Sequence, residues 1–358
     1  MSAASRVTVY VSMPLRGPSG AAGRDVVAGA RMALAQAHGR AGDVRVRAIY
    51  LDDTSGPRAR WSPARAGANA RRATEDTTAV AYVGDFESGA SRTSEPITNA
   101  ARLLQVSPAS TAIGLVRPFP GSNELPAGEQ EGGERTFGRV IPDDEAQAAA
   151  AATWIRRLGA KRVQIVDDNS SYGRTLAEGV RDSLPRRLIT GGEPDLVYYG
   201  GLAHGERRAS SRRALPRGAG RGTGAPVMGS AALLEPFRGR AVPAALYATS
   251  SAQDPSQLPA RGRRFAAAFE RRYDRAPGPY AAYGYEAMAV VLASIRRAGD
   301  EGTDRQAVVD AFFAMRNRRS VLGTYSIDTA GNTTLDRLTG YRLGFGGRPH
   351  PVALLPAR

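Results

Sequence analysis

The 358-residue sequence contains no cysteine, which excludes disulfide bonds, thiolate nucleophiles and cysteine-ligated metals. Its three histidines, His38, His204 and His350, lie far apart along the chain. They leave few candidates for a Ser-His-Asp triad and argue against a histidine-rich metal site. No apolar run reaches the roughly 18 residues of a membrane span. The glycine pattern of a phosphate-binding loop does not precede Lys161. We therefore expect no enzyme, no metal site and no cofactor.

Lysine is almost absent as well, because Lys161 is the only lysine among 49 basic residues. With 34 acidic residues the formal net charge is +15, which would suit a nucleic acid or an anionic membrane. The arginines are nevertheless spread along the chain, and alanine and glycine are abundant too, as a GC-rich genome produces. This distribution favours compositional bias and solvated faces over a functional basic surface. No helix-turn-helix segment precedes Val7, so we expect no nucleic-acid partner.

Short apolar runs alternate with alanine-rich stretches of helical spacing, and the length suits two domains of roughly 150 residues. Strands are predicted at 7–13, 44–51, 79–83, 103–106, 163–167, 196–199, 227–229 and 246–249, with a closing pair of 323–328 and 340–345. Helices are predicted at 23–36, 63–76, 91–101, 144–158, 172–184, 207–217, 258–273, 283–298 and 305–315. A loop rich in Pro, Gly and Glu, 117–134, separates the halves. This order predicts an α/β protein with two doubly wound parallel sheets.

In such folds a ligand binds at the carboxyl ends of the strands. Ser88 follows a predicted strand and precedes a helix, and Ser110 and Thr111 follow another strand. Free backbone N–H groups at a helix start, with hydroxyls beside them, suit a carboxylate. The alternative is that Ser88 merely caps its own helix. Asp52-Asp53 and Asp167-Asp168 also end strands, where such pairs more often cap turns than bind metal.

Four blocks of sequence, in order between residues 13 and 201, carry a family resemblance. They are Met13–Pro18, Tyr82–Ser88 with Val106–Ala112, Val163–Asp168 with Ser171–Gly173, and Asp195–Gly201. With them the chain resembles the type I periplasmic binding proteins of the Leu/Ile/Val-binding branch, the solute receptors of amino-acid ABC transporters.

The resemblance implies two lobes joined by three crossovers, near 139–142, 248–251 and 323–326. Lobe one would comprise 1–138 plus 252–322. Lobe two would comprise 143–247 plus 326–358, and is shortened near 184–195, where the family usually places a further helix and strand.

The resemblance also implies a ligand site between the lobes. The residues matching Ser88 and Thr111, with backbone near Ala109 and Ser110, would hold the ligand's α-carboxylate. Tyr172 would line the cleft of lobe two and close on the ligand. Phe86 and Tyr280 could supply apolar walls.

Two positions depart from the family pattern. Leu202 stands where the amino-acid receptors typically place an aromatic residue. Ala231 stands where they place the acid that pairs with the ligand's α-ammonium, and a buried ammonium without a carboxylate is costly. Either Glu235 or Asp254 replaces that acid, or the ligand is a carboxylate without an amino group.

The expected function is that of an extracytoplasmic solute-binding protein of an ABC transporter. It would capture a small amino acid or related carboxylate by lobe closure, and then dock on a permease. The alternative is a ligand-sensing domain of a membrane receptor or kinase. We expect a monomer. The first residues show no export signal, so the resemblance favours a chain whose export segment, with or without a lipid anchor, was removed.

Overall fold

The computed structural model describes residues 5–56, 61–118, 135–201, 224–233, 245–343 and 348–357. The chain separates into two compact units, Met1–Ile141 with Asp254–Leu335, and Pro142–Gln253 with Asp336–Arg358. The last crossing therefore falls at 335/336, later than the predicted 323–326. The intervening segment stays with unit 1 because Gly331 O accepts the Arg139 backbone N–H at 2.9 Å and Asn332 Oδ1 accepts Arg139 Nε–H at 2.7 Å.

Unit 1 is built on a six-stranded sheet of order β2-β3-β1-β4-β5-β6. Its strands are β1 (Arg6–Met13), β2 (Arg40–Ala41), β3 (Val44–Asp52), β4 (Ala79–Val83), β5 (Leu104–Ser107) and β6 (Phe137–Arg139), and a separate pair is formed by β11 (Arg318–Arg319) and β12 (Thr324–Tyr325). All neighbours in the six-stranded sheet are parallel except β2 and β3. Seven of the eight residues of β1 are buried, on both faces, as a parallel sheet covered by helices requires.

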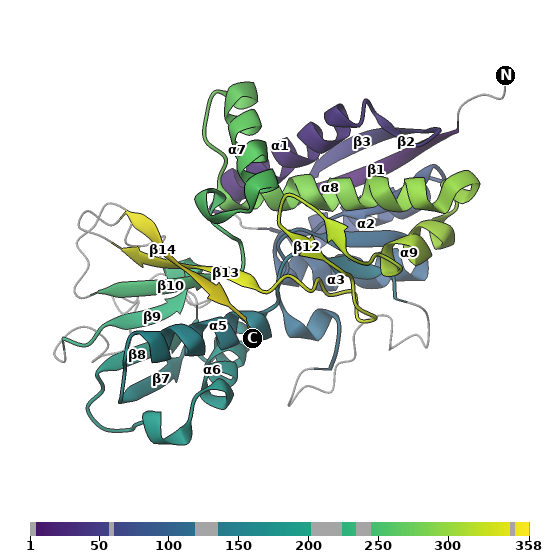
Figure 1. Ribbon diagram of the computed structural model, residues 1–358. Coiled ribbons are helices and arrows are strands. Elements are labelled where there is room, and N and C mark those ends of the chain that lie inside the picture. The colour runs from purple at the N-terminus through teal and green to yellow at the C-terminus, as the bar shows by residue number, and fades with distance from the viewer. Residues whose placement is uncertain are drawn as a thin grey trace. The chain divides into compact units, whose positions relative to one another are not determined.

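The helices of unit 1 cover both faces of this sheet (Figure 1). They are α1 (Gly20–Gln36), α2 (Pro63–Glu75), α3 (Ser88–Ala100), α7 (Ala260–Tyr273), α8 (Pro279–Ala298) and α9 (Arg305–Phe313), with short 3₁₀ helices η1 (Ile113–Leu115), η5 (Pro255–Gln257) and η6 (Gly299–Glu301). α1, α8 and α9 pack together on one face, and α2 packs with α3 on the other. α1 and α8 lie side by side (Figure 1).

Glycines allow α1 and α8 to approach closely. A Cβ atom on Gly29 would lie 2.0 Å from the carbonyl oxygen of Ala281, and one on Gly284 would lie 2.2 Å from that of Val26. No carbon can occupy either position unless the two helices separate, so the α1–α8 contact depends on these glycines.

A Gly284→Ala variant is therefore expected to lower the free energy of unfolding by roughly 1–3 kcal/mol, the usual cost of overpacking. Gly67→Ala in α2 is the matched control, because its Cβ would lie 3.4 Å from the end of the flexible Arg71 side chain and 3.7 Å from the Thr93 methyl group, both ordinary contacts. Urea denaturation of both variants measures the difference. Equal stability of the two would contradict the close packing of α1 on α8.

Unit 2 is built on a second six-stranded sheet, of order β14-β13-β10-β9-β8-β7. Its strands are β7 (Val163–Asp167), β8 (Leu196–Gly200), β9 (Val227–Ser230), β10 (Leu246–Ser250), β13 (Arg337–Leu343) and β14 (Pro349–Pro356), and its helices are α5 (Asp144–Arg157), α6 (Ser171–Ser183) and the 3₁₀ helices η2 (Arg186–Leu188) and η3 (Ala231–Leu233). β7 to β10 run parallel. Residues 184–195 contribute only η2 and one bridge, Val163 to Ile189.

Local sequence signals explain where the helices of unit 2 start. The Asp143 carboxylate accepts the Ala146 N–H at 3.0 Å at the start of α5, and two acids follow in the first turn. Ser170 Oγ accepts the Gly173 N–H at 2.9 Å at the start of α6. Such caps satisfy backbone donors that the helix itself leaves open.

The predicted closing pair of 323–328 and 340–345 is wrong. Thr324–Tyr325 pairs with Arg318–Arg319 in unit 1, whereas β13 pairs with β10 and with β14 in unit 2. The sequence prediction missed β14 because it contains Pro349, Pro351 and Pro356. Proline is tolerated there because β14 lies at the edge of the sheet, where a ladder donor is dispensable.

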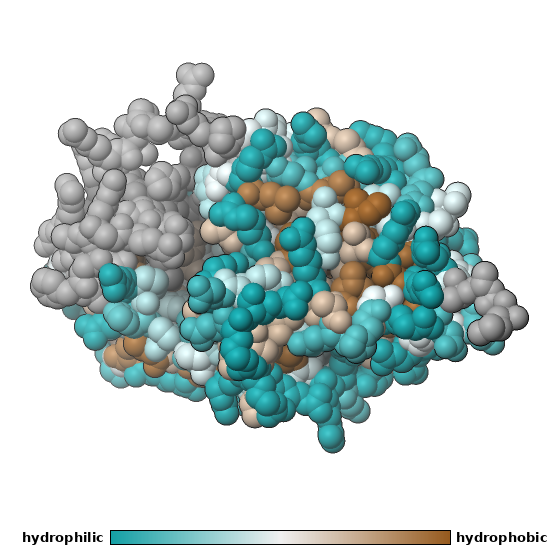
Figure 2. All heavy atoms as spheres, turned by 90° about the horizontal axis from the view of Figure 1, so that it is seen from above, coloured by the Kyte–Doolittle hydropathy of each residue, from teal (hydrophilic) through white to brown (hydrophobic). Residues whose placement is uncertain are grey.

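The described surface is mostly polar. Figure 2 shows hydrophilic side chains over most of the described face, with apolar side chains between them. Among the described residues the exposed large apolar side chains are Leu158, Val352 and Leu354. No described helix is both long and apolar enough to cross a membrane, and the described residues contain no cluster of acids and histidines that could hold a metal ion.

Candidate functional site

The strand order of unit 1 reverses at one point. From β1 the chain goes to β3 on one side of β1, and later to β4 on the other side. Accordingly α1, which follows β1, and α3, which follows β4, lie on opposite faces. The crevice at such a reversal is where doubly wound sheets bind ligands. The loop after β1 and the loop after β4 meet at this crevice, because Ser19 Oγ donates to Glu87 Oε1 at 2.6 Å.

Ser88, the first residue of α3, lies at this crevice and is half-buried. Its Oγ accepts the backbone N–H groups of Thr111 and Ala112, both at 3.2 Å. Ser88 therefore ties the start of α3 to the loop after β5 instead of capping its own helix. A hydroxyl has two acceptor sites and one donor. With both acceptor sites used, the Ser88 O–H remains to donate to a ligand.

Further donors surround this hydroxyl. The backbone N–H groups of Ser88 and Gly89, in the first turn of α3, have no hydrogen-bond partner in the part of the chain that the structure describes. The half-buried Thr111 hydroxyl likewise has none among the described residues. Open N–H groups at a helix start, together with two hydroxyls, form a donor set for an anionic oxygen.

Ser110 plays a different part from Ser88 and Thr111. Its buried hydroxyl lies 2.8 Å from Ser91 Oγ and donates to the Asp85 carbonyl at 3.1 Å. Ser107 Oγ accepts the N–H groups of Ala109 and Ser110, at 3.2 and 2.9 Å. The structure thus places Ala109 and Ser110 in the buried network that shapes the loop, and leaves Thr111 as the open hydroxyl of that loop.

Two buried acids lie beneath the crevice. The Asp85 carboxyl accepts Tyr82 O–H at 2.9 Å and Ser94 O–H at 2.5 Å, and burial raises its pKa to about 6. Asp53 is fully buried, and neither of its carboxyl oxygens has a hydrogen-bond partner. Burial and then the charges of Asp85, Asp52 and Glu87 raise the Asp53 pKa to about 8. Asp53 thus holds a proton at neutral pH.

The sequence predicts that Asp52 and Asp53 cap a turn, and this holds for Asp52 alone. Asp52 Oδ1 accepts the N–H groups of Thr54 and Leu15, at 3.0 and 3.1 Å, and Asp52 Oδ2 pairs with Arg16 at 2.7 Å. Asp52 thus fixes its turn. Asp53, by contrast, accepts no hydrogen bond from another residue.

Aromatic side chains surround the start of α3. The rings of Phe86 and Tyr280 meet edge to face, with centroids 4.8 Å apart. Burial, and then the charge of Glu87, raise the Tyr280 pKa to about 12, so its hydroxyl stays neutral. The indole of Trp61 lies against Gly89, where a Cβ would be 2.5 Å from the ring. The structure therefore places Phe86 and Tyr280 together, beside the carboxylate of Glu87.

Sequence reasoning missed Trp61 and Glu87. Trp61 is distant from Ser88 in sequence, so only the fold brings the two together. Glu87 adjoins Ser88, and an acid next to a predicted anion site was a visible signal. Its half-buried carboxylate is held by Ser19 through Oε1.

Of the residues predicted for lobe two, the structure describes Tyr172 and Ala231, both in unit 2. Tyr172 is half-buried and packs against the apolar core of unit 2. Ala231, in η3, packs against a second apolar cluster of that unit. Leu202 and Glu235 lie outside the described residues. Asp254, in unit 1, accepts Ser256 N–H at 3.0 Å and Ser256 O–H at 2.6 Å, so its carboxylate fixes its own turn.

Comparison with known families decides the classification. A family model described as periplasmic binding protein matches residues 7–193 and 217–348. The chain belongs to the periplasmic binding protein family. The prediction of this family, made from four sequence blocks, is confirmed, and so is the prediction of parallel-sheet lobes of the type I periplasmic fold.

Several solved structures share the fold of this chain over nearly its full length. A leucine-binding protein LivK from Thermotoga maritima is 21% identical, with a TM-score of 0.71, covering 98% of this chain and 99% of that one. LivJ from Streptococcus pneumoniae, in complex with isoleucine, is 18% identical, with a TM-score of 0.74 and coverage of 98% and 100%. A Rhodopseudomonas palustris solute-binding protein in complex with benzoate is 16% identical, with a TM-score of 0.71 and coverage of 98% and 97%.

A curated relative from Pseudomonas aeruginosa, named amino acid binding protein, is 24% identical over 203 residues. That match covers 56% of this chain and 48% of the relative, so the chain spans about half the length of this curated relative.

Proposed function

We propose that this periplasmic binding protein is the solute-binding component of an ABC transporter and captures a small amino acid. Its carboxylate would be held on unit 1 by Ser88, Thr111 and the first turn of α3, and unit 2 would then close over the ligand with Tyr172. The observation that carries the proposal is the Ser88 hydroxyl, whose two acceptor sites are occupied by backbone N–H groups. It can therefore serve a ligand only as a donor.

Relatives support two ligand classes, because LivJ was solved with isoleucine and the Rhodopseudomonas palustris protein with benzoate. Glu87 favours an amino acid over an amino-free carboxylate as the ligand of this chain. Its carboxylate directly precedes Ser88 and is not paired with any cation among the described residues. An α-amino acid offers a carboxylate to Ser88 and an ammonium to Glu87. Benzoate would bring a second negative charge next to Glu87 without compensation.

Glu87 would also replace the acid that the amino-acid receptors carry at the position of Ala231. Both charges of the amino acid would then be matched on unit 1, and Phe86, Tyr280 and Trp61 would contact its side chain. This assignment removes the need for Glu235 or Asp254.

We expect the melting temperature to rise with one or more of the twenty standard amino acids, leucine, isoleucine and valine foremost, and not with benzoate or 4-methylpentanoate. Glu87→Gln is expected to weaken amino-acid binding by about tenfold or more, because a hydrogen bond between charged groups is worth about 1.5–3 kcal/mol. Glu75→Gln, at an exposed site in α2, is the control. Calorimetric titration measures the affinities. A shift with benzoate alone, strengthened by Glu87→Gln, would contradict the amino-acid assignment in favour of an amino-free carboxylate.

A ligand-sensing domain is the second candidate. It is favoured by residues 184–195, which contribute one 3₁₀ turn and a single bridge next to β7 where transport receptors usually carry a further helix and strand. Reconstitution with the candidate permease separates the two functions. Ligand-dependent stimulation of its ATPase supports transport, and ligand binding without stimulation supports sensing.

A further inference from the structure

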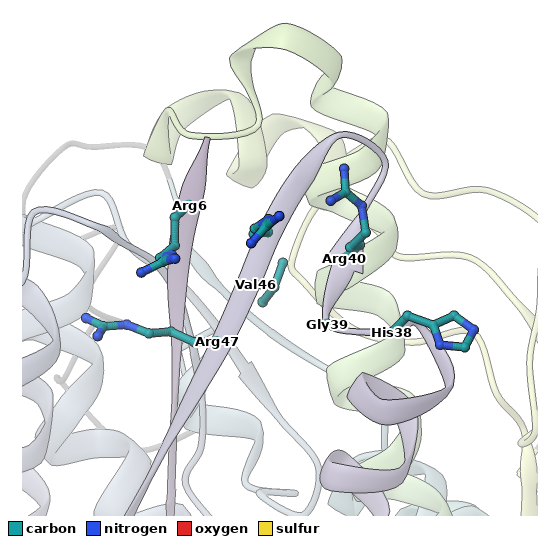
Figure 3. A pocket seen from close by; sticks show the side chains of 7 residues that line it. Arg6, His38, Gly39, Arg40, Val46 and Arg47 are labelled. Carbon is teal, nitrogen blue, oxygen red and sulfur yellow. The ribbon is translucent and has the colours of Figure 1, made fainter. Parts of the chain in front are cut away.

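A basic hollow of about 530 Å³ lies at the other end of the unit 1 sheet, at the amino ends of β1 and β3. Its lining residues come from the end of α1 through β3 and from the first residue of β1: Arg6, His38, Gly39, Arg40, Arg45, Val46 and Arg47. Figure 3 shows the Arg6 and Arg47 side chains extending to the same side of β1 and β3. The Ser88 crevice at the carboxyl ends of the strands is a different site.

The strand register brings the arginines together. Arg6 on β1 is paired with Arg45 on β3, and Arg45 is paired in turn with Arg40 on β2. Neighbouring strands lie about 4.8 Å apart, and residues two apart on a strand share a face at about 6.6 Å. Arg45 and Arg47 therefore share one face of β3, beside Arg6. Arg40, Arg45 and Arg6 thus form a row across three adjacent strands. Arg47 lies two residues beyond Arg45 on β3.

Acidic side chains balance only part of this charge. Arg47 pairs with Asp76 at 3.5 Å and its Nε–H donates to Thr8 Oγ1 at 2.8 Å, and Arg40 lies 3.9 Å from Asp43. Within the described residues, Arg6 and Arg45 have neither an ion pair nor a hydrogen bond from their side chains. Both are exposed.

Such an arrangement has a cost in the free protein. Like charges directly opposite on paired strands destabilise a sheet, and Arg6 and Arg45 are directly opposite. An anion between them would remove the repulsion and receive charge-assisted hydrogen bonds. Guanidinium groups match the geometry of phosphate oxygens, which they bind in a bidentate manner.

We propose that this hollow binds an anion that carries phosphate groups, held chiefly by Arg6 and Arg45 with Arg47 beside them. Triangular spacing of the three cations suits a group with more than one phosphoryl unit. The same chemistry is present in a soluble diphosphate and in the headgroups of an anionic phospholipid surface. The site belongs to unit 1 alone and does not depend on the proposed ligand of Ser88.

Calorimetric titration with pyrophosphate at low ionic strength tests the proposal. Arg6→Gln with Arg45→Gln is expected to lower the affinity at least tenfold. The control is Arg264→Gln with Arg271→Gln, two exposed arginines of α7, which changes the net charge by the same amount. It is expected to change the affinity less than twofold. Equal losses in both variants, or no binding by the unaltered protein, would overturn the proposal, since attraction by the general charge of +15 would then suffice.

The melting temperatures without anion give an independent readout. The Arg6→Gln, Arg45→Gln variant is expected to melt at or above the temperature of the unaltered protein, because the cross-strand repulsion is gone. A lower melting temperature with unchanged pyrophosphate affinity would overturn the proposal. Sedimentation with phosphatidylglycerol vesicles, against phosphatidylcholine vesicles, identifies the source. Arginine-dependent sedimentation indicates a lipid headgroup, and pyrophosphate binding without it indicates a soluble anion.

Discussion

Replacing both Ser88 and Thr111 with alanine is expected to lower the affinity for the amino-acid ligand by at least about 100-fold. The two hydroxyls are open donors at the start of α3, and each hydrogen bond to a charged carboxylate contributes about 1.5–3 kcal/mol. Together that corresponds to two or more powers of ten in the dissociation constant. Calorimetric titration with the amino acid found in the melting screen gives both values.

The controls separate binding from folding. Ser88→Ala also removes the acceptor for the Thr111 and Ala112 N–H groups. The melting temperature of the variant must therefore be measured together with its affinity. Ser88→Thr keeps a hydroxyl at the same position and is expected to retain binding within a few-fold. An unchanged affinity in the double alanine variant would show that these hydroxyls do not hold the ligand, even if a ligand binds elsewhere.

Replacing Asp53 with asparagine is expected to raise stability at pH 8 and to flatten its dependence on pH. The folded state raises the Asp53 pKa to about 8 by burial and by neighbouring acids. Folding therefore retains a proton that the unfolded chain releases above about pH 4. Stability from this group is full below pH 4 and is lost as the pH rises toward 8. The loss is about 1.4 kcal/mol per pH unit for each such proton.

The slope of stability against pH is compared between pH 6 and 8. Asp85, whose pKa burial raises to about 6, is half deprotonated at pH 6 and contributes little to the slope above pH 7. Burial also raises the pKa of Glu95 to about 8, against the opposing charges of Arg135, Arg139 and Arg92, so two protons contribute. Asp53→Asn is expected to halve the slope of unfolding free energy against pH, and Glu95→Gln to remove the other half.

Urea denaturation at several pH values between 6 and 8 measures these slopes. Asp300→Asn, at an exposed site, is the control and is expected to leave the slope unchanged. If Asp53→Asn has the slope of the unaltered protein, Asp53 is charged in the folded state, and the absence of a partner for its carboxyl oxygens would have to be explained otherwise.

Local pattern predicted many elements closely. The spacing of apolar residues and the flanking turn residues predict a strand at 79–83 and a helix at 63–76. The structure has β4 at Ala79–Val83 and α2 at Pro63–Glu75. Helix 91–101 was predicted three residues late, because Ser88 and Gly89 are poor helix formers. α3 nevertheless begins at Ser88, because the Glu87 carbonyl accepts the backbone N–H groups of Ala90 and Ser91, at 3.0 and 3.1 Å. Predicted helix 207–217 and most of the predicted loop 117–134 lie outside the described residues.

The sequence by itself determined the absence of cysteine, the alternation of strands and helices, the family, and the position of Ser88 between a strand and a helix. These depend on composition and on patterns within a few residues. Only the tertiary structure decided the strand order that joins the Ser19 and Glu87 loops, the contact of Trp61 with Gly89, the burial of Asp53 without a partner, and the row of Arg40, Arg45 and Arg6. Each of these depends on contacts between strands and loops that are far apart in the sequence. These contacts set the charge and hydrogen bonding of both proposed sites.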